Sequence, residues 1–187
     1  MKTRHSDSLI LAWRVAEYEA RQVKSDQIEP PHLMLGLCKI VDLDLPALVS
    51  KETPERDEIL EEVLREVRRL RAVFKASDLN AKVFRRTLRQ SCQPPRGVGL
   101  VPDQLRRSKK TRDVFRDAEH FAEMTNSLVY PVHLLYAVLL VRDEQRSQVM
   151  TSMGIDERRL EQVTKQEVLF RRDVLDDRTA KRRSGLN

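Results

Sequence analysis

Two histidines are the first residues in this sequence whose type and spacing suggest chemistry. His32 and His133 stand two residues after Pro30 and Pro131 and just before an apolar run, in matching places in the first turn of a predicted helix. A pair of imidazoles can bind a metal ion, but no cysteine or carboxylate lies at ligand spacing from either one. We therefore expect two hydrogen-bonded structural histidines and no metal site.

The two cysteines are the next candidates for chemistry. Cys92 lies close in sequence to the four arginines of residues 85–96, whose charge would lower the pKa of its thiol, but no histidine base is near it. Cys38 occupies the position of Leu139 in a related segment, so we expect a buried, inert thiol. Two cysteines do not make a disulfide framework, which favours the reducing cytoplasm.

The glycines exclude one common kind of nucleotide site. They stand at positions 36, 97, 99, 154 and 185, and none begins a Gly-x-x-x-x-Gly-Lys-(Ser/Thr) phosphate loop. We expect no cofactor and no enzyme activity from this chain. The longest apolar run, residues 134–141, is also too short for a membrane-spanning helix.

Positive charge is concentrated in one segment. Residues 85–112 contain nine Lys or Arg and a single acidic residue, residues 171–187 carry a net charge of +3, and the remainder is mildly acidic although the whole chain is +6. Four cations at the end of the first segment are our candidate site for an acidic partner: Arg106, Arg107, Lys109 and Lys110. The alternative is a solvated linker whose charge only keeps the chain soluble.

These residues belong to a sequence that repeats itself. Eight residues of the first copy illustrate the match: Ser6, Trp13, Ala16, Ala20, Ile28, Pro30, His32 and Leu33. They return in the same order as Ser108, Phe115, Ala118, Ala122, Val129, Pro131, His133 and Leu134. Such a repeat indicates two copies of one supersecondary unit, neither of which buries its apolar face alone.

Each copy is predicted to be a run of short helices. Ser6 and Ser108 are expected N-caps, and Pro30 and Pro131 suit the first position of the buried helices that follow. Further helices are predicted over residues 45–49, 54–74, 79–91, 147–153 and 156–168, with Gly154 as a left-handed cap. Few aromatic residues, 5%, and five glycines also favour an all-α protein.

This pattern resembles the double-repeat N-terminal domain of the Clp AAA+ unfoldases. The resemblance is carried by the two Ala-x-x-x-Ala helix endings, the β-branched residues Ile28 and Val129, the His-Leu-(Met/Leu) triplets, and Gly154-Ile155-Asp156. It covers residues 6–170 apart from the connector. One departure concerns the position before each histidine, where many relatives have a carboxylate that helps to form a ligand pocket; Pro31 and Val132 stand there, so we do not transfer that pocket.

The resemblance implies an all-α fold of two four-helix repeats related by a pseudo-twofold axis, without the ATPase ring. We expect one domain over residues 1–170, with repeats at about 6–76 and 108–170, a long basic connector at about 77–107, and a charged tail at 171–187.

The resemblance also implies a protein-binding role. We expect a monomeric substrate receptor, adaptor or regulator of a Clp unfoldase-protease, or the N-terminal part of such an unfoldase, with a Clp ring, an adaptor or an unfolded substrate as partner. The alternative is a nucleic-acid-associated or regulatory protein that binds through the basic connector. No helix-turn-helix, zinc finger or aromatic stacking platform supports that alternative, so only charge favours it.

Overall fold

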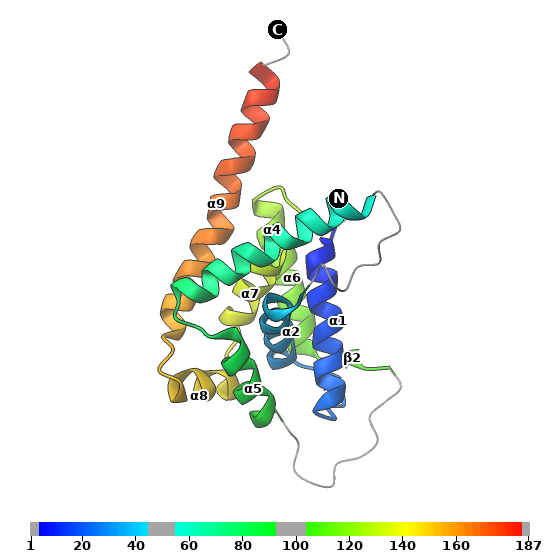
Figure 1. The fold of residues 1–187 in the computed structure, drawn as a ribbon, viewed down its shortest axis with the longest axis vertical. Helices are drawn as coiled ribbons and strands as arrows, with labels where there is room; N and C mark the ends of the chain where they lie inside the picture. Colours follow the sequence, from blue (N-terminus) through cyan, green and yellow to red (C-terminus); the bar gives the residue numbers. More distant parts are fainter. Residues whose placement is uncertain (1–3, 45–54, 93–103, 185–187) are drawn as a thin grey trace.

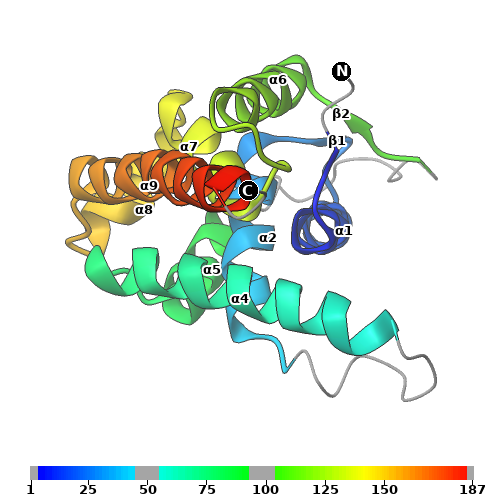
Figure 2. The ribbon, with the colours of Figure 1, turned by 90° about the horizontal axis from the view of Figure 1, so that it is seen from above.

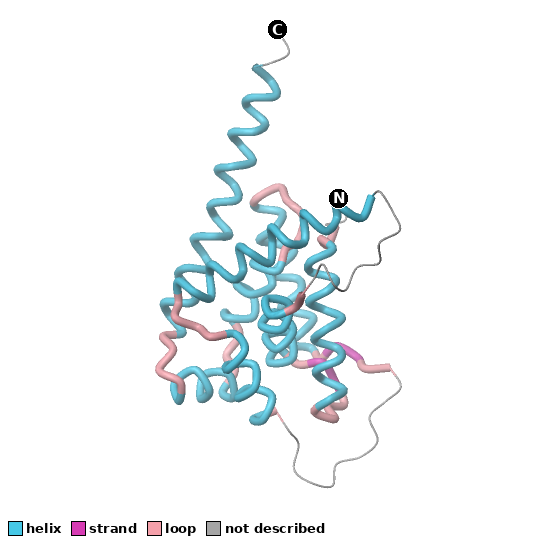
Figure 3. The backbone as a smooth tube through the Cα atoms, viewed as in Figure 1, coloured by secondary structure: helices cyan, strands magenta, loops and turns pink. Residues whose placement is uncertain are grey.

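The computed structural model describes residues 4–44, 55–92 and 104–184. Within these ranges the chain is almost entirely helical, with eight α-helices and two very short strands, as the sequence predicted (Figure 1; Figure 3). The predicted short helix at 45–49 lies outside the described residues. None of the helices in the described ranges is long and apolar enough to cross a lipid bilayer.

Helices α1 (Asp7–Gln22) and α6 (Lys109–Met124) begin in the same way in the two copies. The side chain of Ser6 accepts from the backbone N–H of Leu9, and the side chain of Ser108 accepts from that of Thr111. Each serine therefore satisfies an amide that the first helical turn leaves without a partner.

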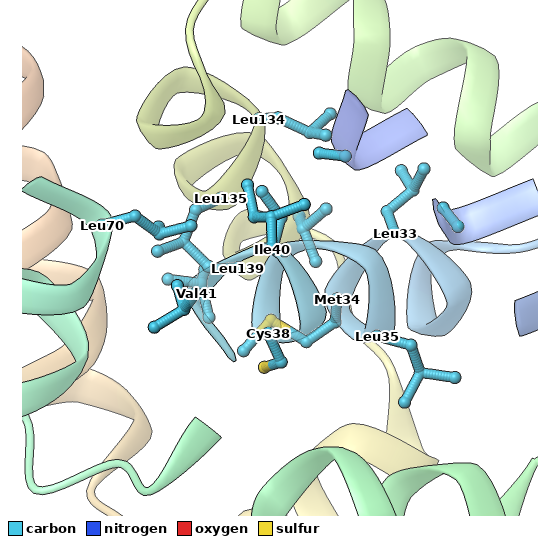
Figure 4. Packing of buried hydrophobic residues seen from close by; sticks show 14 of the residues in the cluster. Leu33, Met34, Leu35, Cys38, Ile40, Val41, Leu70, Leu134, Leu135 and Leu139 are labelled. Atoms are coloured by element: carbon cyan, nitrogen blue, oxygen red, sulfur yellow. The ribbon is translucent and has the colours of Figure 1, made fainter. Parts of the chain in front are cut away.

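Helices α2 (Pro30–Asp42) and α7 (Pro131–Leu140) form the centre of the core. Both begin with proline, whose missing N–H is not needed at that position, and both are buried over nearly their whole length. Figure 4 shows Ile40 of α2 lying beside Leu135 and Leu139 of α7, in one cluster that also contains Leu33 and Leu134. The two copies thus share one core.

The backbone crosses between the copies in a reciprocal manner. Strand β1 (Gln27–Ile28), just before α2, pairs in parallel with β2 (Arg106–Arg107), just before α6. In the other direction His5, just before α1, bridges to Val129, just before α7. Equivalent segments therefore exchange equivalent hydrogen bonds, as a pseudo-twofold arrangement requires.

The remaining helices cover this centre. They are α4 (Glu55–Ala76), α5 (Ala81–Ser91), α8 (Glu144–Ser152) and α9 (Glu157–Ser184). Helix α5 falls within the range assigned to the connector, yet Phe84 and Leu88 are completely buried, so this part of the range packs into the body. Helix α9 continues through residues 171–184 and extends away from the other helices in Figure 1, and in the view from above its C-terminal end faces the viewer (Figure 2).

Candidate functional site

The four candidate cations lie together at the start of the second copy, and all four are exposed. Arg106 and Arg107 form β2, while Lys109 and Lys110 belong to the first turn of α6. No acidic residue stands in that turn. Cations near a helix N-terminus are disfavoured by the helix dipole, so an anionic neighbour would be stabilised here by both the charges and the dipole.

The backbone that carries these cations is held firmly. The N–H of Ser108 donates to the carbonyl of Ile28 at 3.1 Å, and the hydroxyl of Thr111 donates to the same oxygen at 2.7 Å. The guanidinium of Arg112 donates to the carbonyl of Arg107 at 2.6 Å. This end of the basic segment is therefore part of the folded body.

Arg107 has a specific position over two aromatic rings. Its guanidinium carbon lies 5.5 Å from the ring centroid of Trp13 and 5.2 Å from that of Phe115. A cation at this distance from an aromatic face is attracted by the ring quadrupole, more strongly when it is partly desolvated. One of the four candidate cations is thus fixed at the junction of α1 and α6.

A small pocket opens at the same junction. It has a volume of about 140 Å³ and is lined by His5, Leu9, Ile10, Trp13, Arg107 and Phe115. Its walls are mainly aliphatic and aromatic, and Ile10 is 45% exposed at the edge. Together with Arg106, Lys109 and Lys110, these pocket residues form what we call the seam site.

The two histidines are structural in the way that the sequence predicted. The Nδ1 atom of His32 accepts from the backbone N–H of Glu29 at 2.9 Å, and that of His133 accepts from Tyr130 at 3.0 Å. Burial lowers the pKa of His32 to about 4. In the described ranges, no group of three or more His, Cys, Asp or Glu side chains is arranged to hold a metal ion.

The thiols are less reactive than an ordinary cysteine. Cys38 is completely buried, and this burial raises its pKa strongly. Burial also raises the pKa of Cys92 to about 11. The idea that neighbouring arginines lower the pKa of Cys92 is therefore wrong: burial is the largest cause of the shift and outweighs a lowering by the hydrogen bond with Ser91, and the carboxylates of Asp143 and Glu19 raise the pKa further.

One charged cluster was not found from the sequence. Glu19 is 1% exposed, and its carboxylate accepts hydrogen bonds from Arg85 at 3.0 Å and from Arg89 at 2.6 Å. A signal was present, because Glu19 lies on the buried face of α1 between Ala16 and Ala20. A carboxylate on such a face requires partners, and both come from α5, more than sixty residues away.

The chain is similar to known proteins in its three-dimensional structure. Neither a protein-family model nor a curated protein sequence matches the chain. The Hsp104 N-terminal domain from Candida albicans aligns with a TM-score of 0.60 at 16% identity, covering 86% of this chain and 89% of that one. The N-terminal domain of the caseinolytic protease associated chaperone ClpD from Arabidopsis thaliana aligns with a TM-score of 0.56 at 16% identity, covering 88% and 97%.

A third solved structure agrees with these two. A protein of a malarial protein secretion system aligns with a TM-score of 0.59 at 14% identity, covering 88% of this chain and 95% of that one. Each alignment spans most of both chains, so the likeness concerns the whole arrangement of helices and not one motif. The chain has the all-α fold of the Clp and Hsp104 N-terminal domains.

Proposed function

We propose that this chain is a protein-binding recognition module of the Clp type, and that the seam site is its binding surface. The observation that carries the proposal is Arg107, which lies over Trp13 and Phe115 at the edge of a small apolar pocket. Arg106, Lys109 and Lys110 lie within three residues of Arg107 in the chain, and all three are exposed and positively charged.

This combination suits a peptide segment that carries both apolar and acidic side chains. An apolar side chain would enter the pocket, while neighbouring carboxylates would face the basic residues around it. Aromatic and arginine side chains at the centre of a contact are the residue types that contribute most to protein binding. The proposed partner is therefore an acidic segment of another protein, either an unfolded substrate, an adaptor or a Clp ring.

The cellular role follows from the likeness to chaperone domains. We propose that the chain acts, as a monomer in the cytoplasm, as a substrate receptor, adaptor or regulator of a Clp unfoldase-protease, or as the N-terminal part of such an unfoldase. Its 187 residues contain no phosphate loop, so its own contribution is recognition and not catalysis. Domains of shared fold differ in function, and the role therefore needs a direct test.

The test measures binding to a defined unfolded protein. Trp13 is the only tryptophan of the chain and lines the pocket, so its fluorescence reports on occupation of the site. We expect reduced and carboxymethylated ribonuclease A, an acidic unfolded probe that contains no tryptophan, to change that fluorescence saturably. Reversal of Arg106, Arg107, Lys109 and Lys110 to Glu should weaken the binding at least about tenfold, most of all at low salt.

A matched control separates binding at the seam site from a general effect of net charge. Arg68, Lys75, Lys82 and Arg86 are four exposed cations on α4 and α5, and their reversal to Glu changes the net charge equally. We expect that control to bind nearly as the unmodified chain does. Equal weakening by both variants, or an unchanged affinity after reversal at the seam site, would overturn the proposal.

The nucleic-acid alternative is tested with the same variants. Aromatic platforms for bases need an open ring face, whereas Phe115 is 5% exposed and Arg107 lies over both rings. We therefore expect weak binding to a random DNA duplex. Tight binding with a steep salt dependence, and none to the unfolded protein, would favour the alternative.

A further inference from the structure

A second and larger pocket lies on another side of α1. It has a volume of about 480 Å³ and is formed by α1, α2 and α5. Its lining residues are Arg14, Val15, Tyr18, Glu19, Gln22, Lys39, Arg85 and Arg89. We call it the basic pocket. It shares no residue with the seam site, so the two can be altered separately.

The charge of the basic pocket is unbalanced. Four of its lining residues are cationic and only one, Glu19, is acidic, which leaves three positive charges in excess. Glu17 lies 3.7 Å from Arg14, but Glu17 also pairs with Arg21 at 3.3 Å. Counting both Glu17 and Arg21 therefore leaves the excess of three positive charges unchanged. Like charges gathered in one pocket repel one another, and a bound anion would relieve that repulsion.

The guanidinium groups are arranged before any ligand arrives. Arg89 donates to Glu19 through both Nε and Nη2, and Arg85 donates through Nη1. The buried carboxylate therefore fixes the side chains of Arg85 and Arg89, which are 17% and 35% exposed. Side chains held in this way lose less conformational entropy when they bind an anion.

We propose that the basic pocket is a binding site for a phosphate monoester. A phosphate monoester carries a charge of about −1.5 to −2 at neutral pH and three strong acceptor oxygens, whereas a carboxylate offers one charge and two oxygens. Four cationic side chains from three helices match the larger charge, and guanidinium groups bind phosphate with two parallel hydrogen bonds. Tyr18, 58% exposed, adds a hydroxyl donor and an aromatic wall for the group that bears the phosphate.

Two kinds of molecule could supply the phosphate monoester: a phosphorylated side chain of a partner protein, or a small phosphate compound. Glu19 acts as a positioning residue in either case, because it touches the arginines and not the ligand. The site goes beyond the proposed protein-binding role, since it would make recognition depend on a phosphate group that the seam site does not need.

The experiment follows backbone amide shifts of the full chain by NMR during titration with phenyl phosphate. We expect saturable shifts at residues of α1, α2 and α5 around the basic pocket. The double variant Arg14→Gln with Lys39→Gln removes two cations but leaves the Glu19 cluster intact, and should weaken binding at least about tenfold. The variant Arg68→Gln with Lys75→Gln, two exposed cations on α4, is the matched control and should bind as the unmodified chain does.

Two further titrations identify the source and the selectivity. A phosphoserine peptide that binds at least about tenfold more tightly than inorganic phosphate would support a phosphorylated protein as the source, and equal affinities would support a small phosphate compound. Acetate should bind far more weakly than either. The proposal is overturned if acetate binds equally well, if shifts scatter over the whole surface, or if the control variant loses as much affinity as the double variant.

Discussion

Trp13 and Phe115 pack edge to face, with ring centroids 5.4 Å apart and ring planes at 80°. They occupy equivalent positions in the two sequence repeats, 102 residues apart like the capping residues Ser6 and Ser108. Equivalent residues of a twofold pair touch each other only close to the axis. The pseudo-twofold axis therefore passes between α1 and α6 at these two rings, directly beneath Arg107.

The first prediction concerns this aromatic pair. Phe115 is 5% exposed, so Phe115→Ala should lower the free energy of unfolding by about 3 kcal/mol. The repeat alone suggests a similar loss for Trp13→Ala, but Trp13 is only half-buried, and we expect about 2 kcal/mol. Urea unfolding of both single variants and the double variant should give a coupling energy of about 0.5–1.5 kcal/mol. Strictly additive losses would show that the two rings do not interact.

The second prediction concerns the contact between α1 and α2. A Cβ atom on Gly36 would lie 2.4 Å from the backbone oxygen of Ala12 and 3.0 Å from the Cβ of Ala16. Because backbone atoms cannot move aside cheaply, Gly36→Ala should destabilise the fold by about 2 kcal/mol, although alanine is the better helix former. Thermal unfolding measures the loss. Ala72→Gly, at an exposed position within α4, measures the helix-propensity effect alone, and a stabilised Gly36→Ala variant would contradict the tight contact.

The parts of the fold that were predictable depend on local chemistry. Ser6, Ser108, Pro30 and Pro131 mark the starts of four helices, and the structure confirms all four. Gly154 has the expected left-handed backbone, with φ +68°. Caps and turns involve residues only a few positions apart, so the sequence contains the information needed to recognise them.

One missed feature is a local cap, and the others depend on contacts between distant residues. Helix α8 begins at Glu144, three residues before the predicted start, because the side chain of Asp143 caps it. At the sites, the cations of the basic segment could be identified from the sequence, but their partners could not: Arg107 contacts Trp13 across 94 positions, and Arg85 contacts Glu19 across 66. No spacing rule connects residues so far apart, and only the packed helices bring them together.

The third prediction concerns Arg146, which closes the end of α7. This guanidinium is almost completely buried, donates to the carbonyls of Val138, Leu139 and Val141, and pairs with Glu157 at 2.7 Å. Arg146→Met keeps much of the side-chain volume but removes the guanidinium donors of those carbonyls, of which that of Val138 still accepts from the N–H of Val141. We expect a loss of about 3 kcal/mol in the free energy of unfolding, measured with urea.

A neighbouring residue provides the control for Arg146. Arg158 is exposed at the start of α9, and Arg158→Met removes the same charge from the surface. Its effect should stay within about 0.5 kcal/mol, as for most exposed substitutions. Similar losses for both variants would mean that net charge, and not the capped carbonyls, determines the result.

The last prediction concerns the pH dependence of stability. Burial lowers the pKa of His32 from 6.5 to about 4 in the folded protein, so between these pH values the unfolded chain binds more protons than the folded one. The free energy of unfolding must therefore rise with pH across this window. The contribution of His32 is complete above pH 6.5 and falls by about 3 kcal/mol as the pH approaches 4.

His32→Asn isolates this contribution from that of the carboxylates, which titrate in the same range. Asparagine does not titrate, and its side-chain oxygen can still accept from the N–H of Glu29, as Nδ1 of His32 does at 2.9 Å. Urea unfolding at several pH values should show the two proteins converging in stability as the pH falls from 6.5 toward 4. Parallel curves over that window would mean that His32 is protonated as easily in the folded chain as in the unfolded one, and that the buried cap does not favour the neutral imidazole.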